Sequence, residues 1–165
     1  MSFKGIKIIP VFLCIFALNG CVFSTFGDSI NAFTERLNNL QENYTISAEN
    51  YIIDTEKATL TKFFKFDQNE LMLQFKYDHK NRLNEMNIAF DFTAENGTDE
   101  LQFIKDLITA FCQNEATSNE LMDATDFEKA IKTIRMETIS AESENIKIEI
   151  DTTQLGTIIS VYKDI

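Results

Sequence analysis

Near the start of the chain, apolar residues recur every three or four positions, which is the spacing of one face of a helix. The residues that follow this spacing are Ile30, Phe33, Leu37, Leu40 and Tyr44. Polar residues lie between them, and Asp28 and Ser29 are residue types that favour the position before a helix. The pattern predicts an amphipathic helix over residues 29–43 that packs on a sheet.

The apolar period then changes to two, which is typical of strands with one buried face. Residues 71–78 and 83–92 alternate cleanly between apolar and polar. Before them, residues 44–55 are polar and β-branched, and residues 58–66 are rich in phenylalanine. The connections between the last three segments are short and polar, as in antiparallel hairpins. We therefore expect four consecutive strands.

Helical spacing returns after a turn signal at residues 94–97. Asp99 and Gln102 have the spacing of a capping box, in which two side chains bond the free N–H groups at a helix start. The apolar stripe that follows consists of Leu101, Ile104, Leu107, Ile108, Phe111 and Cys112. These features predict a second helix.

A third helical segment is predicted over residues 120–136, with a break near Ala124. Thr125 and Glu128 form a second possible capping box, at which the helix would restart.

Period-two alternation ends the chain. It is regular over residues 145–151, residues 155–163 are rich in β-branched residues, and residues 137–141 have a weaker pattern. The order is therefore helix, four strands, two helices, and two or three strands. Because strands and helices do not alternate strictly, we expect an α+β fold: an antiparallel sheet of about six or seven strands with helices packed on one face.

The first residues have the pattern of an export signal. Lys4 and Lys7 precede residues 8–18, which carry no charge. This run is shorter than the roughly 20 apolar residues that a membrane-spanning helix needs, and it has the length of a signal-peptide core. It is followed by Leu18-Asn19-Gly20-Cys21.

This combination resembles the signal peptide and lipobox of bacterial lipoproteins, in which the cysteine is lipidated. The resemblance implies that residues 1–20 are removed, that Cys21 carries the lipid anchor, and that residues 21–27 form a short tether. A single globular domain over residues 28–165 would follow. The alternative is an ordinary secretory signal or a buried N-terminal helix, with Cys21 as a plain thiol.

The resemblance also implies an extracytoplasmic location, anchored to a bacterial membrane. Val22 is similar to the context that permits transfer to the outer membrane, where the cell has one. With Cys14 removed and Cys21 lipidated, Cys112 is the only thiol of the mature chain. No disulfide within the mature chain is therefore expected.

The charge of the chain excludes one class of function. The 165 residues carry 26 acidic and 15 basic side chains, for a net charge of −11. A general nucleic-acid binder needs clustered Lys and Arg, so nucleic acid is not an expected partner. The acidic residues are spread along the chain, which favours a role in solubility; a basic partner or divalent cations are the alternatives.

Candidate catalytic residues are few. His79, the only histidine, lies in a polar stretch between two strands, where an exposed loop residue is expected. Cys112 lies on the apolar stripe of a helix, where a buried thiol is expected. Two groups of carboxylates are candidates for a cation site, although helix starts attract acidic residues anyway. They are Asp91, Glu95, Asp99 and Glu100, and then Asp123, Asp126 and Glu128.

Phenylalanine is concentrated in the predicted sheet, at Phe63, Phe64, Phe66, Phe75, Phe90 and Phe92. Alternation places Phe64 and Phe66 on one face of the sheet and Phe63 on the other. The cluster is either a Phe-rich core or, if one face is uncovered, a surface that binds a hydrophobic ligand or a partner.

These patterns predict a membrane-anchored envelope lipoprotein with a non-catalytic binding domain, no enzymatic activity and no cofactor or metal. Its partners would be the membrane, through the anchor, and another envelope protein. A carrier or sensor of a lipid or other hydrophobic ligand is the alternative function, and a small hydrolase is a third.

Overall fold

A computed structural model describes residues 30–41, 45–66, 69–80, 82–91, 98–134 and 137–163 of the chain. Residues 30–40 are helical and are called the N-terminal helix below. The other helices are α2 (Thr98–Cys112), α3 (Glu115–Ala124) and α4 (Phe127–Lys132). The strands are β1 (Ile52–Asp54), β2 (Thr59–Phe66), β3 (Asn69–Tyr77), β4 (Leu83–Phe90), β5 (Ile139–Ser143), β6 (Ile146–Thr153) and β7 (Gly156–Lys163).

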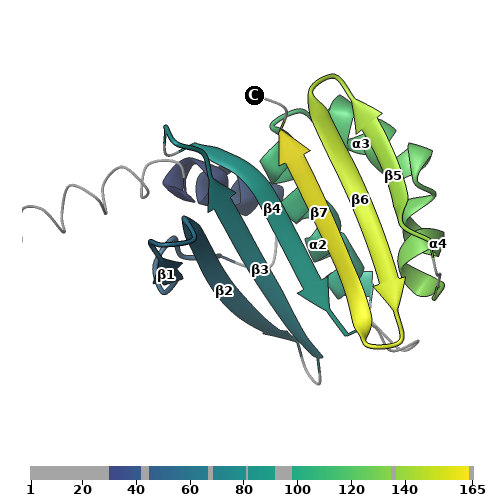
Figure 1. Ribbon diagram of the computed structural model, residues 1–165, viewed down its shortest axis with the longest axis horizontal. Coiled ribbons are helices and arrows are strands. Elements are labelled where there is room, and N and C mark those ends of the chain that lie inside the picture. The colour runs from purple at the N-terminus through teal and green to yellow at the C-terminus, as the bar shows by residue number, and fades with distance from the viewer. Residues whose placement is uncertain are drawn as a thin grey trace, which may run out of the picture.

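The strands form one seven-stranded sheet in the order β1-β2-β3-β4-β7-β6-β5, and every neighbouring pair is antiparallel. Figure 1 shows the helices gathered behind the sheet, on one of its two faces. We call this the helical face and the other the open face. The α+β class, the antiparallel sheet, the order of elements and the placement of helices on one face are all as the sequence predicts.

Two strand meanders meet in the middle of the sheet. The chain builds β1 to β4, crosses behind the sheet through α2, α3 and α4, and then builds β5 to β7. The last strand, β7, pairs with β4, and Ile88 lies opposite Ile159. Both side chains are completely buried, so this central pairing is also a centre of the core.

Aromatic side chains join the helices to the sheet. The ring of Phe75 on β3 meets that of Phe33 on the N-terminal helix, edge to face, with 4.8 Å between centroids. It also stacks with Phe111 of α2 at 6.5 Å. Nearer the start of α2, the ring centroid of Phe103 lies 5.2 Å from those of Phe64 and Phe66. These contacts hold the N-terminal helix and α2 on the same face.

The first predicted strand is much shorter than expected. Residues 44–55 were expected to be extended, but β1 contains only Ile52–Asp54. Asn38 of the N-terminal helix explains the difference, because its side chain accepts a hydrogen bond from the Ile46 N–H and donates one to the Ile46 carbonyl. This docking of the loop to the helix, together with a left-handed backbone at Asn50, keeps the preceding residues out of the sheet.

The third predicted helix begins earlier than expected. Helix α3 begins at Glu115 rather than at residue 120, because the Asn114 side chain caps it by accepting a hydrogen bond from the Ala116 N–H. Its first turns bury Thr117 and Ser118, and Ser118 shares a 2.8 Å hydrogen bond with Thr109 of α2. Buried hydroxyl residues carry no apolar period, so the pattern missed this part of the helix. The predicted break near Ala124 is confirmed.

Both predicted capping boxes are wrong. Helix α2 begins at Thr98, so Asp99 lies inside it, and the Gln102 amide donates to Asp106 instead. Thr125 donates back to the carbonyl of Leu121, one turn earlier. Glu128 pairs with Lys105 at 2.6 Å. In each case a tertiary or backward contact uses the side chain that local spacing assigned to a cap.

We expect two phenylalanines of the sheet to differ sharply in their effect on stability. Phe75→Ala removes a fully buried ring at the junction of three elements and should lower the free energy of unfolding by about 3–5 kcal/mol. Phe63→Ala, which removes a ring that is 49% exposed, should cost less than about 1 kcal/mol. Urea denaturation of the two variants measures the difference, and equal losses would contradict the assignment of faces.

Candidate functional site

The two candidate catalytic residues, His79 and Cys112, lie in opposite surroundings, one exposed and one buried. His79 is exposed in the turn between β3 and β4, as predicted. Cys112 is buried at the end of α2. Burial raises the pKa of the Cys112 thiol to about 11, although nearby Lys163 acts in the opposite direction. The thiol is therefore protonated near neutral pH and is a poor nucleophile.

Lys163 is the most unusual cation among the described residues. Burial, with repulsion from Arg36, lowers the pKa of its ammonium group to about 8. The nitrogen lies 4.5 Å from the centroid of the Phe111 ring, so the charge rests on an aromatic face. Arg36 in turn donates a 2.9 Å hydrogen bond to the carbonyl of Ala110. These contacts secure the end of β7 against α2 and the N-terminal helix.

Three of the carboxylates considered for a cation site are engaged separately. Glu100 accepts hydrogen bonds from Asn69, and Asp126 pairs with Lys129 at 3.4 Å. The Lys105 ammonium lowers the pKa of Glu128. Glu95 lies outside the described residues. Within the described ranges, no group of three or more His, Cys, Asp or Glu side chains is arranged to hold a metal ion.

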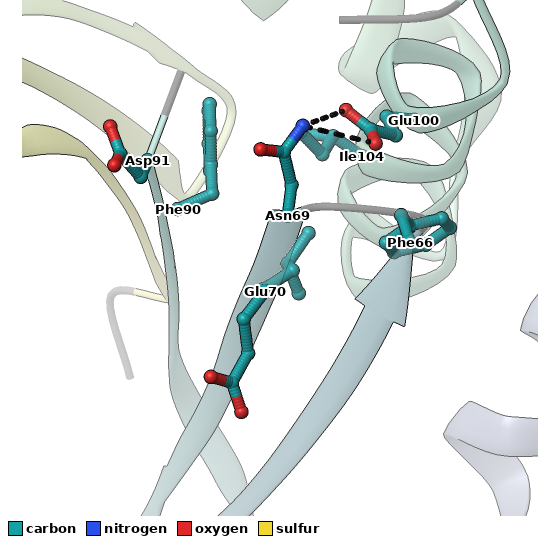
Figure 2. Close-up of a pocket in the computed structure, with 8 residues that line it drawn as sticks. Phe66, Asn69, Glu70, Phe90, Asp91, Glu100 and Ile104 are labelled. Carbon is teal, nitrogen blue, oxygen red and sulfur yellow. Dashed lines mark hydrogen bonds between the residues drawn. The ribbon is translucent and has the colours of Figure 1, made fainter. Parts of the chain in front are cut away.

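A crevice lies where the ends of β2, β3 and β4 approach α2 (Figure 2). In Figure 2 the Asn69 amide turns toward Glu100, while the carboxylates of Glu70 and Asp91 point away from the helix. Phe66, Phe90 and Ile104 line the crevice with apolar side chains. The remaining cavity is about 10 Å³, which is about the space that one water molecule needs and far below that of a ligand site.

One carboxylate is buried between the N-terminal helix and α2. Asp106 accepts hydrogen bonds from the side-chain amides of Gln41 and Gln102. Burial raises the pKa of Asp106, although the Gln102 hydrogen bond acts in the opposite direction. The two neutral amides donate hydrogen bonds to the Asp106 carboxylate but do not neutralise its charge. Ionisation of Asp106 in the folded protein is therefore costly.

The open face of the sheet is organised in three bands that cross the strands. In the first, Lys76 pairs with Glu85 at 2.6 Å. In the second, Gln74 donates to Thr61 at 3.2 Å and Ser160 donates to Asn87 at 2.7 Å. The third band is apolar. The polar side chains named in the first two bands are paired with one another. The third band is therefore the part of the open face best suited to contact a partner.

We call this third band the apolar row. The strand register places its members side by side on β2, β3, β4 and β7, and they are Phe63, Met72, Ala89 and Ile158. Phe63 is 49% exposed and Ile158 is 48% exposed. Leu155, in the turn between β6 and β7, is 92% exposed beside them. Together they line an open groove of about 440 Å³.

Acidic side chains border the apolar row. Glu70 and Asp91 line the groove, and Asp151 lies opposite Ile158 in the register. All three are exposed, and none makes an ion pair with a residue in the described part of the chain. Lys65, opposite Glu70, is the one basic neighbour in the same register. The rim of the groove is therefore negatively charged.

The phenylalanine cluster is divided between the two faces of the sheet. Phe64, Phe66 and Phe75 pack on the helical face, and Phe63 lies on the open face, as alternation predicts. Phe92 lies outside the described residues. The contributions of Ile158 and Leu155 were missed, because their position beside Phe63 depends on the pairing of β4 with β7.

Comparison with protein-family models, curated proteins and solved structures found no match to this chain. In the part of the chain that the structure describes, no helix has the length and apolar character to cross a membrane.

We expect Asp106→Asn to stabilise the protein at neutral pH. A carboxyl whose pKa is raised by folding stabilises the fold fully only below its unfolded pKa, and that stability is lost as the pH rises through the folded pKa. Removing the charge should therefore raise Tm at pH 7 by about 2–4 °C. The gain should shrink as the pH falls through the raised pKa of Asp106, because the parent carboxyl is then protonated as well.

Calorimetry across this pH range tests the expectation. Asp123→Asn removes an equal charge from an exposed position on α3 and serves as the control, with no such pH-dependent gain. A lower Tm for Asp106→Asn at pH 7 would show that the ionised form is needed.

Proposed function

We propose that this chain is a lipid-anchored, non-enzymatic binding protein of a bacterial envelope, and that the open face of its sheet binds another envelope protein. The observation that carries the proposal is the apolar row. Antiparallel sheets often turn one face to water, but that face is normally polar. Contiguous apolar side chains, of which Phe63 and Ile158 are about half exposed, with an acidic rim, are typical of an interaction site.

The anchor is supported by the N-terminal sequence. The basic start, the uncharged residues 8–18 and the cysteine of Leu18-Asn19-Gly20-Cys21 have the order found in bacterial lipoproteins. Residues 22–27 would span at most about 20 Å when extended, so a domain behind them would remain near the bilayer. This favours a partner in or close to the same membrane, which is the outer membrane where the cell has one.

A carrier of a hydrophobic ligand has less support than a binding domain. A ligand held between the Phe-rich sheet and the helices would lie where Phe64, Phe66 and Phe103 are in ring contact. The crevice at the end of this layer has room for about one water molecule. The groove on the open face is wide and shallow, which suits a protein surface better than a small molecule.

The anchor is tested by Cys21→Ala. We expect the parent protein to sediment with membranes and its N-terminal peptide to carry the mass of attached acyl chains. The variant should lose the acyl mass and the processing that depends on it. Mass spectrometry of the membrane fraction gives the result. An unmodified Cys21 in the parent would refute the anchor and leave the binding proposal to stand on the open face alone.

Binding by the open face is tested by site-specific crosslinking in intact cells. A photo-crosslinking amino acid in place of Ile158 should join the protein to a defined envelope protein. The same amino acid in place of Asp123, on the helical side, should not. Adding Phe63→Lys to the first variant should abolish the product, because it places a charge in the apolar row. Equal products from both positions, or none from position 158, would contradict the proposal.

A further inference from the structure

We infer that the apolar row binds an amphipathic helix whose apolar stripe is flanked by Lys or Arg. The inference rests on the proposed function, because it specifies the partner that the open face would take. It follows from three features of the groove: its direction across the strands, its shape and its charge.

The direction of the row favours a helix over an extended peptide. Phe63, Met72, Ala89 and Ile158 cross four adjacent strands. An extended peptide gains most of its affinity by hydrogen bonding to a free strand edge. Strands β3, β4 and β7 each have neighbours on both sides. Strand β1 covers only Thr59–Thr61 of β2, so the free edge of β2 lies at one end of the row and runs across its direction. A partner on this row therefore needs a backbone whose hydrogen bonds are satisfied internally.

The spacing between members of the row is close to the rise of an α-helix per turn. Adjacent strands lie about 4.8 Å apart, so four strands place the ends of the row about 14 Å from each other. An α-helix rises 5.4 Å per turn and covers this distance in about ten residues. A helix laid across the strands would bring one apolar residue per turn close to successive strands. Leu155 extends the apolar surface beyond this span.

The floor of the groove has a low centre between higher sides. Ala89 is the smallest member of the row, and Gly156 lines the same groove on β7. Gly156 has φ +138°, and a Cβ there would lie 2.7 Å from the Phe90 carbonyl oxygen, so a side chain is strongly disfavoured. In the register, the larger side chains of Met72 and Ile158 lie on either side of Ala89. A Leu or Phe of the partner helix would fit into this depression.

The charge of the rim determines which helix fits. Glu70, Asp91 and Asp151 surround the row, and among the described residues Lys65 is the one basic side chain beside them in the register. The whole chain carries −11. A second copy of the chain would bring the same three carboxylates against them, and an anionic lipid surface would also be repelled. Lys or Arg beside the apolar stripe would instead pair with the rim.

The test uses an 18-residue fluorescent peptide of Leu and Lys at helical spacing. The full protein is held in nanodiscs of zwitterionic lipid, and empty nanodiscs provide the background. We expect saturable binding by fluorescence anisotropy. Ile158→Lys should weaken binding at least about tenfold. The triple variant Glu70→Gln/Asp91→Asn/Asp151→Asn should weaken binding about three- to tenfold, and its binding should depend less on salt. A peptide of Leu and Glu should not bind.

Matched controls separate a specific site from general attraction. Glu115→Gln/Asp123→Asn/Glu137→Gln removes the same number of charges from exposed positions outside the groove and should bind as the parent does. A scrambled peptide of the same Leu and Lys content should bind weakly. Circular dichroism and thermal melting confirm that each variant is folded.

Three results would overturn the inference: equal weakening by both triple variants, equal binding of the scrambled peptide, or dimerisation of the protein that Ile158→Lys abolishes in sedimentation. The last would make a second copy the occupant. A crosslinked partner from position 158 without peptide binding would reject the helix and retain the proposed function. Absence of any crosslink would reject the proposed function itself.

Discussion

The packing of Phe75 between Phe33 and Phe111 is the contact on which the two-layer arrangement depends. It joins β3, the N-terminal helix and α2 in one aromatic cluster, on one side of the sheet. Because the apolar stripes of both helices are used there, neither helix can cover the opposite side. The open face is thus a direct result of how the core is completed, and its half-exposed apolar side chains have no partner from the described helices.

Paired and unpaired charges occupy different parts of the open face. Lys76 and Glu85 neutralise each other, as do Lys147 and Glu149. Glu70, Asp91 and Asp151, by contrast, stand around the apolar row without ion pairs to described residues. Excess negative charge is therefore found where the surface is also apolar, and this coincidence links the net charge of the chain to a particular kind of recognition.

Local patterns in the sequence predict most of the elements, because each depends on a period of two or of three to four residues. Alternation alone places Phe63 opposite Phe64. Failures arise where contacts between distant residues decide. Asn38 draws Ile46 away from the first strand, and Thr109 with Ser118 supports a helix start that has no apolar period. The groove required the register that sets Ala89 beside Ile158, and no local rule contains that pairing.

The position of β7 gives the chain a particular order of assembly. It is the last of the described strands to leave the ribosome, yet it lies between β4 and β6. Until it arrives, both of those strands have unpaired edges that can join other chains. Pairing partners so far apart in sequence also close slowly. A polypeptide truncated before residue 156 would consequently have two half-sheets that no strand pairing joins, and it would be prone to aggregation and to proteolysis.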